Sequence, residues 1–150
     1  MKRYLVPLLV LMFLRVGGSW LAAADPAATP GALVCPVTGR AIDKNVSIDY
    51  QGAKLYFNSP ECIAKFQADP AKYAVNANYQ LAVTGQARQV ACPFTGKALN
   101  PNIPSVKVGV LDIKFCCRAC QQTVAKADPE TRMDLVFGDA FATGFVVAKK

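Results

Sequence analysis

The sequence predicts an α+β protein of two small consecutive modules, each with a cysteine on a turn, a β-hairpin and short helices. Two pairs of segments, 57 to 59 residues apart, support this prediction. CPVTGRAID, which begins at Cys35, returns as CPFTGKALN from Cys92, and LYFNSPECIAKFQADPAKY returns as IKFCCRACQQTVAKADPET. In both copies, strand-favouring runs precede a helix and an Asp-Pro pair. A repeat of this length indicates two copies of one supersecondary unit.

The expected modules cover residues 35–91 and 92–150. In the CP-x-TG opening, Pro supplies a fixed φ angle and Gly tolerates a positive one, and a tight turn needs both. Each opening cysteine should therefore lie on a turn. Short runs of β-branched and aromatic residues around a turn predict a hairpin after each opening. The expected strands are Val46–Tyr50 and Lys54–Phe57 in the first module, and Ser105–Val110 and Asp112–Phe115 in the second.

A helix is expected after each hairpin. In the first module Ser59 is a good N-cap, Pro60 suits the first helical position, and Cys62 falls on the apolar face. In the second module Cys116 and Cys120 are four residues apart and share one helix face. An Asp-Pro pair then ends each helix and can cap a second one. Modules of this size bury little core alone, so the cysteines are structural as well as functional candidates.

The amino terminus has the order of a secretory signal peptide. Lys2 and Arg3 are followed by an apolar run over residues 4–14 and by small residues at 22–24. This order is typical of a cleaved signal, so we expect residues 1–24 to be removed. The apolar run is shorter than the roughly 20 residues that a membrane-spanning helix needs, so no stable membrane anchor is expected after cleavage.

Export would define the compartment and charge of the mature chain. The protein would be periplasmic or secreted, where disulfides persist, so disulfide bonding stays open for all six cysteines. Residues 25–34, rich in Pro, Ala and Gly, are expected to form a linker. Loss of three of the 17 basic residues leaves 14 against 10 acidic ones, a formal charge of about +4. These charges are scattered, so no nucleic-acid binding is expected.

The segment FCCRAC contains two overlapping cysteine patterns. Cys116 and Cys120 are spaced C-x-x-x-C, which suits metal ligands on one helix face, whereas Cys117 and Cys120 are spaced C-x-x-C, which suits a redox pair. Alignment of the two modules places Ser59 opposite Cys117, so the redox pair has no counterpart in the first module. The repeat therefore favours metal binding over redox chemistry without excluding the latter.

Thiolate ligands favour soft metals, with four sulfurs suiting zinc and two or three suiting Cu(I). The chain has no histidine, which excludes imidazole ligands and Ser-His or Cys-His catalysis. Phosphate loops and nucleophile elbows are also absent from the sequence, so we expect no enzyme. The candidate metal ligands are Cys92, Cys116 and Cys120, with Cys117 as a further donor, and Cys35 and Cys62 in the first module.

The order of cysteine turn, hairpin, YFNSPEC or KFCCRAC, helix and Asp-Pro resembles that of YHS/TRASH-like domains. These are small, treble-clef-like metal-binding modules linked to heavy-metal trafficking, sensing and resistance. The resemblance implies that Cys92, Cys116 and Cys120 are ligands. Asn58 stands where the family more often has Cys or His, and the opening differs from the usual D-P-V-C-G. The first module is therefore expected to be a degenerate, mainly structural copy.

These observations together predict an exported, non-enzymatic protein that binds zinc or copper in metal trafficking, storage or resistance. Its expected partners are the metal ion and an unidentified protein. Two alternatives stay open. One is a thiol-disulfide oxidoreductase that uses Cys117 and Cys120, and the other is a disulfide-stapled structural interaction module.

Overall fold

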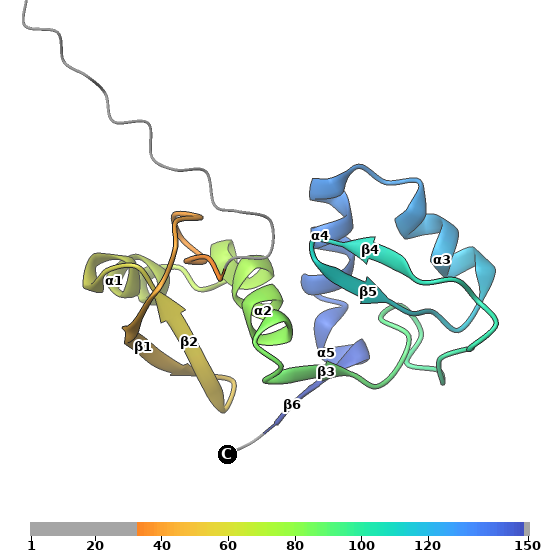
Figure 1. The fold of residues 1–150 in the computed structure, drawn as a ribbon, viewed down its shortest axis with the longest axis horizontal. Helices are drawn as coiled ribbons and strands as arrows, with labels where there is room; N and C mark the ends of the chain where they lie inside the picture. Colours follow the sequence, from red (N-terminus) through yellow and green to blue (C-terminus); the bar gives the residue numbers. More distant parts are fainter. Residues whose placement is uncertain (1–32, 149–150) are drawn as a thin grey trace, which may run out of the picture.

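A computed structural model describes residues 33–148, which combine short helices with three two-stranded sheets (Figure 1). The predicted α+β class is confirmed. The expected signal peptide over residues 1–24 and most of the expected linker over 25–34 lie outside the described residues. Within residues 33–148, no helix combines the length and apolar character needed to cross a membrane.

The first half, residues 33–91, begins with an antiparallel hairpin, as the sequence predicts. Its turn at Gln51 and Gly52 has φ values of 54° and 85°, the positive values that two-residue hairpin turns require. Ser59 is the N-cap of the following helix, and Pro60 is its first residue. The elements of this half are β1 (Asp43–Tyr50), β2 (Ala53–Phe57), α1 (Pro60–Ala68), η1 (Ala71–Tyr73), α2 (Ala74–Val83) and β3 (Ala87–Gln89).

The second half, residues 92–148, repeats the order of cysteine turn, hairpin and helix. Asp128 caps its second helix, since its Oδ1 accepts hydrogen bonds from the N–H groups of Glu130 (3.1 Å) and Thr131 (3.0 Å). The elements of this half are β4 (Val106–Val108), β5 (Leu111–Ile113), α3 (Arg118–Ala125), α4 (Pro129–Phe137), α5 (Phe141–Gly144) and β6 (Phe145–Val147).

The second hairpin is shorter than the sequence predicts. Its turn falls at Gly109, which has a φ of 60°, so the strand expected over Ser105–Val110 ends at Val108. At the other end, pairing stops at Ile113, so the strand expected over Asp112–Phe115 is also shorter than predicted. The antiparallel pairing of β6 with β3 is not predicted by any local pattern in the sequence.

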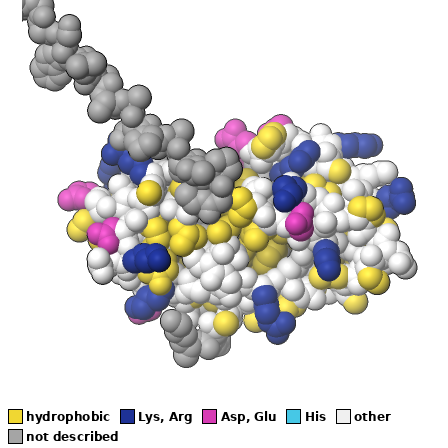
Figure 2. Space-filling model, viewed as in Figure 1, with side chains coloured by type: hydrophobic (Ala, Val, Ile, Leu, Met, Phe, Trp, Pro, Cys, Tyr) yellow, Lys and Arg dark blue, Asp and Glu magenta, His cyan; other side chains and the backbone are white. Residues whose placement is uncertain are grey.

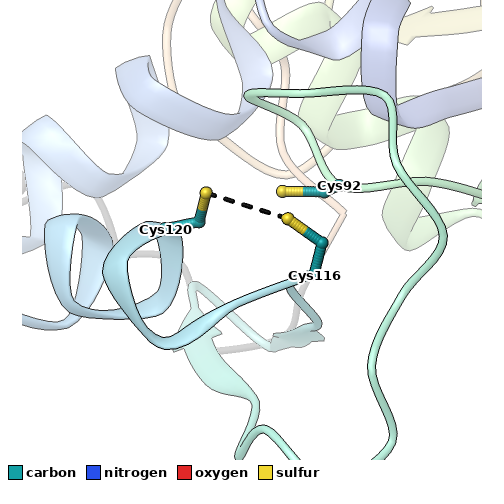
Figure 3. A group of neighbouring side chains, drawn as sticks. All are labelled: Cys92, Cys116 and Cys120. Atoms are coloured by element: carbon teal, nitrogen blue, oxygen red, sulfur yellow. Dashed lines mark hydrogen bonds between the residues drawn. The ribbon is translucent and has the colours of Figure 1, made fainter.

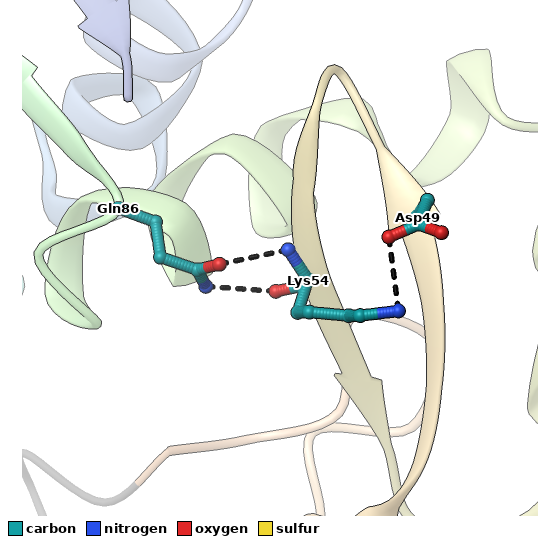
Figure 4. Close-up of polar contacts among 3 residues, drawn as sticks. All are labelled: Asp49, Lys54 and Gln86. Atoms are coloured by element: carbon teal, nitrogen blue, oxygen red, sulfur yellow. Dashed lines mark hydrogen bonds and ion pairs between the residues drawn. The ribbon is translucent and has the colours of Figure 1, made fainter. Parts of the chain in front are cut away.

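Glutamine side chains occupy the hairpin edges where a further strand would pair. Gln86 accepts a hydrogen bond from the Lys54 N–H at 2.7 Å and donates one to the Lys54 carbonyl at 2.8 Å (Figure 4). Gln89 makes the same pair of bonds to Lys114, at 3.0 and 2.7 Å. Lys54 also reaches Asp49 at 3.0 Å, but the Lys54 side chain is partly exposed and that of Asp49 is largely exposed, so this ion pair contributes little. The amides thus satisfy edge groups that would otherwise be unpaired.

The larger of two hydrophobic clusters in the described residues is shared by both halves, and α2 packs against α4 between the two hairpins (Figure 1). Phe137 of α4 is fully buried, and its ring lies 5.2 Å from that of Tyr79 and 5.5 Å from that of Phe145. The buried Asn78 of α2 donates a hydrogen bond to the Phe137 carbonyl at 2.8 Å. Because this core holds residues of both halves, the position of one half depends on the other.

Charged side chains are spread over the face shown in Figure 2. Lysines and arginines lie singly or in small groups on that face, with acidic and apolar side chains between them. The excess of positive charge therefore forms no continuous stripe on this face.

Candidate metal centre

Cys92 lies at the start of a tight turn. Its N–H donates to the Lys97 carbonyl at 2.9 Å, and its carbonyl accepts from the Gly96 N–H at 2.9 Å. Gly96 has a φ of 67°, in the left-handed region that favours glycine. The CPFTG opening thus folds as a turn and presents the Cys92 thiol to the interior, where the residue is fully buried.

The carboxyl-terminal elements hold this turn from the opposite side. The Gly144 carbonyl accepts hydrogen bonds from the N–H groups of Val90 (2.9 Å) and Ala91 (3.1 Å). A Cβ atom on Gly144 would lie 2.9 Å from the Cα of Pro93, closer than real Cβ contacts come. Only glycine therefore lets α5 approach the cysteine turn this closely.

The start of α3 supplies the other three cysteines of the second half. Cys117 is the N-cap, Cys116 precedes it, and Cys120 lies in the first turn of the helix. The thiols of Cys92, Cys116 and Cys120 all lie within 4.8 Å of one another and point toward a common centre (Figure 3). We call these three sulfurs the thiol triad. Cys116 and Cys120 are half-buried and their sulfurs are 4.0 Å apart, whereas Cys117 is exposed and lies outside the triad.

The thiol triad has the chemistry and spacing of a soft-metal site. A tetrahedral zinc ion with bonds of about 2.3 Å holds its sulfur ligands roughly 3.8 Å apart, so the triad needs only a small contraction to bind one. Three sulfurs fill the shell of a three-coordinate Cu(I) ion, or leave one position open on zinc. All six cysteines are free in the structure, and no two form a disulfide.

The thiols of this centre differ in how readily they ionise. Burial opposes ionisation of Cys92, but hydrogen bonds to the backbone of Cys116 and Phe94 and to the Thr95 side chain outweigh it and lower the pKa to about 7. Burial raises the pKa of Cys120, and its hydrogen bond to Cys117 raises it further, to about 12. A hydrogen bond to the backbone of Cys120, together with the one to its side chain, lowers the pKa of Cys117. A metal ion would therefore meet one readily ionised thiol and would have to displace the proton of Cys120.

Two side chains that hold the cysteine segments in place were not predicted from the sequence. The Thr95 hydroxyl lies 3.2 Å from the Cys116 sulfur. Gln89 donates to the carbonyls of Ala91 (3.2 Å) and Lys114 (2.7 Å), so one amide ties the residue before Cys92 to the segment before Cys116. Thr95 and Gln89 lie 21 and 25 residues in sequence from their partners in the α3 segment, so no local pattern identifies them.

The first half has a turn of the same kind but no third sulfur. Cys35 opens a turn closed by the Gly39 N–H at 2.9 Å, and Cys62 lies in the first turn of α1; both are buried. Between them the Asn58 Oδ1 lies 3.1 Å from the Cys62 sulfur and accepts a hydrogen bond from the Thr38 hydroxyl at 3.1 Å. An amide oxygen thus takes the place that the Cys116 thiol holds in the triad, and it is a poorer ligand for soft metals.

Comparison with known proteins bears on the first half. Residues 34–77 match the family model described as the YHS domain. The match runs from just before Cys35 into α2, so this segment is similar to a YHS domain. The thiol triad lies beyond the matched residues. No curated protein and no solved structure matches the chain.

Proposed function

We propose that this protein is an exported, non-enzymatic carrier of a soft metal ion, built from two tandem YHS/TRASH-like modules of treble-clef type. The thiol triad of Cys92, Cys116 and Cys120 is the metal site and takes one zinc or Cu(I) ion. The observation that carries the proposal is the convergence of three thiols from two separate segments within 4.8 Å. The YHS match over residues 34–77 and the same order of elements after Cys92 support the modular part.

The exposure of the site favours transfer of the metal over a purely structural role. Structural zinc sites are usually closed by four protein ligands, whereas this triad offers three. Cys116 and Cys120 are half-buried, so a partner's ligand can reach the ion from solvent. An open position of this kind suits delivery to, or uptake from, another protein in trafficking or resistance. The first half then serves as a structural module whose Cys35 and Cys62 pack in its core.

The export and partner assignments rest on the sequence. The leader over residues 1–24 supports secretion or a periplasmic location. The scattered charges of the face in Figure 2 support the absence of nucleic-acid binding. The metal ion is the proposed ligand, with an acceptor protein as the second partner.

Metal analysis of matched cysteine variants tests this function. The chain is purified under reducing conditions, loaded anaerobically with zinc or Cu(I), desalted and measured by elemental analysis. Cys92→Ser should lose the ion. Cys35→Ser is the matched control, because it alters an equally buried cysteine on the corresponding turn, and it should keep the ion. An absence of bound metal in the unaltered chain, or equal loss in both variants, would overturn the proposal.

The same preparations separate the two alternative functions. An oxidoreductase would catalyse thiol-disulfide exchange on an added substrate without bound metal, and Cys117→Ser would abolish the activity. A structural module would show stably paired cysteines in the chain purified without reductant, and it would bind no metal.

A further inference from the structure

Cys117 lies beside the thiol triad without belonging to it. Its sulfur is 3.4 Å from the Cys120 sulfur, closer than the 4.0 Å that separates Cys116 from Cys120. Cys117 is exposed, whereas Cys120 is half-buried. A solvent-borne reagent therefore has readier access to the Cys117 sulfur than to the sulfurs of the triad.

We propose that Cys117 makes the metal site redox-gated: a low-molecular-weight disulfide oxidises Cys117 and Cys120 to an intramolecular disulfide and so releases the metal. This regulation rests on the proposed function, because Cys120 is one of the three proposed ligands. Metal binding and disulfide formation compete for the same sulfur, and only one can hold it at a time.

The reaction proceeds by two thiol-disulfide exchanges. The Cys117 sulfur attacks one sulfur of the small disulfide; a mixed disulfide forms, the small disulfide bond breaks, and one small thiol leaves. The Cys120 sulfur then attacks the Cys117 sulfur, which closes the protein disulfide and expels the second small thiol. The Cys117 thiol and the metal-bound Cys120 thiolate are oxidised, the bond between Cys120 and the metal breaks, and one small disulfide is reduced to two thiols. Cys117 supplies the proton of the first departing thiolate, and solvent supplies that of the second, because Cys120 lost its own proton on metal binding.

The geometry favours Cys117 over Cys116 as the partner of Cys120. Formation of the disulfide shortens the distance between the Cys117 and Cys120 sulfurs from 3.4 Å to about 2.05 Å. Rotation of the two side chains can produce this change. Cys116 starts farther away, is half-buried and contacts the Thr95 hydroxyl at 3.2 Å. Cys117 also stays free while the triad holds a metal, so its attack requires no prior release. Loss of Cys120 leaves two sulfurs, too few for a tight zinc site.

The first half contains a natural control for this arrangement. Ser59 is the N-cap of α1 with φ −158° and ψ 160°, close to the −153° and 163° of Cys117. Its hydroxyl lies 3.7 Å from the Cys62 sulfur, as the Cys117 sulfur lies near Cys120. A serine therefore fits this helix start and cannot form a disulfide. Cys117→Ser should preserve the fold and the triad while removing the proposed redox step.

Zinc release from the full chain tests the gate. Wild type and Cys117→Ser are loaded with zinc, desalted, and treated with glutathione disulfide, and released zinc is followed with a chromophoric chelator. Zinc is redox-inert, so its release reports on the ligands alone. Trypsin cleaves after Lys114, Arg118 and Lys126, so mass spectrometry can detect a bond between the peptides 115–118 and 119–126.

We expect glutathione disulfide to release zinc from wild type, with linkage of the two peptides. Cys117→Ser should start with the same zinc content and should release it no faster than in buffer alone. Wild type that keeps its zinc in the oxidant would overturn the gate, as would release or peptide linkage that persists in Cys117→Ser. A Cys117→Ser chain that binds no zinc would also overturn it, since Cys117 would then be a ligand. Failure of the proposed function would be detected at an earlier step. In that case the reduced wild type would contain no zinc before any oxidant is added.

Discussion

Replacing Gln89 by leucine removes a side chain that ties the Cys92 turn to the segment before Cys116. Gln89 makes three hydrogen bonds, to the Ala91 carbonyl and to both backbone groups of Lys114. Each typically contributes about 0.5–1.5 kcal/mol, and partial solvent exposure puts the expected loss of folding stability near the low end, about 1–2 kcal/mol. Because the lost bonds join the two segments that carry the triad, we also expect zinc affinity to fall by about 10- to 100-fold, as for other groups that orient metal ligands.

Gln86→Leu is the matched control for this prediction. Gln86 also makes three hydrogen bonds, two to the Lys54 backbone and one to the Thr84 hydroxyl, but none of them reaches a segment that carries a cysteine of the triad. Urea unfolding of the metal-free chains should show similar losses of stability in the two variants. A zinc titration against a competing chelator should show weaker binding in Gln89→Leu alone. Equal weakening in both, or in neither, would refute the positioning role of Gln89.

Three further predictions concern the framework. Phe137→Ala should cost about 3–5 kcal/mol in urea unfolding, since the ring is fully buried in the shared core; a wild type that unfolds in two separate steps would contradict that core. Gly144→Ala should weaken zinc binding because its Cβ displaces Pro93 beside Cys92, and an unchanged zinc titration would count against this contact. Asp128→Asn tests the α4 cap: hydrogen bonds from the Thr131 side chain and backbone hold the pKa of Asp128 below its ordinary 3.8. The charge therefore stabilises the fold above that pH and loses its effect as acidification protonates the carboxyl. The difference in urea midpoint between wild type and variant should vanish in acid, and its persistence there would argue against the cap.

Local signals predicted the parts of the fold that depend on local chemistry. Ser59 with Pro60 and Asp128 with Pro129 marked helix starts, because caps and N1 prolines act within one helical turn. The turn at Cys92 followed from Pro and Gly in its opening. The repeat indicated that Cys92 and Cys120 belong together, because each module has one turn cysteine and one helix cysteine at matching positions, and the C-x-x-x-C spacing added Cys116.

Features that depend on distant contacts could not be predicted in this way. The pairing of β3 with β6 joins Ala87 to Val147 across most of the second half. The Gln89 amide takes the place of a strand at the hairpin edge. From the sequence alone, Gln89 cannot be told apart from a polar residue that is simply exposed to solvent. The exclusion of Cys117 from the triad depends on the direction of a side chain at the helix start, which spacing alone does not determine.

The sulfur count around a bound zinc ion tests the central proposal most directly. X-ray absorption at the zinc edge on the reduced, zinc-loaded chain should show three sulfur ligands at about 2.3 Å and one lighter ligand in the fourth position. Cys116→Ser should lower the sulfur count by one, whereas Cys62→Ser, which alters a buried cysteine of the first half, should leave it unchanged. A shell of oxygen or nitrogen ligands, or a sulfur count that Cys116→Ser does not change, would contradict the assignment of the thiol triad as the metal site.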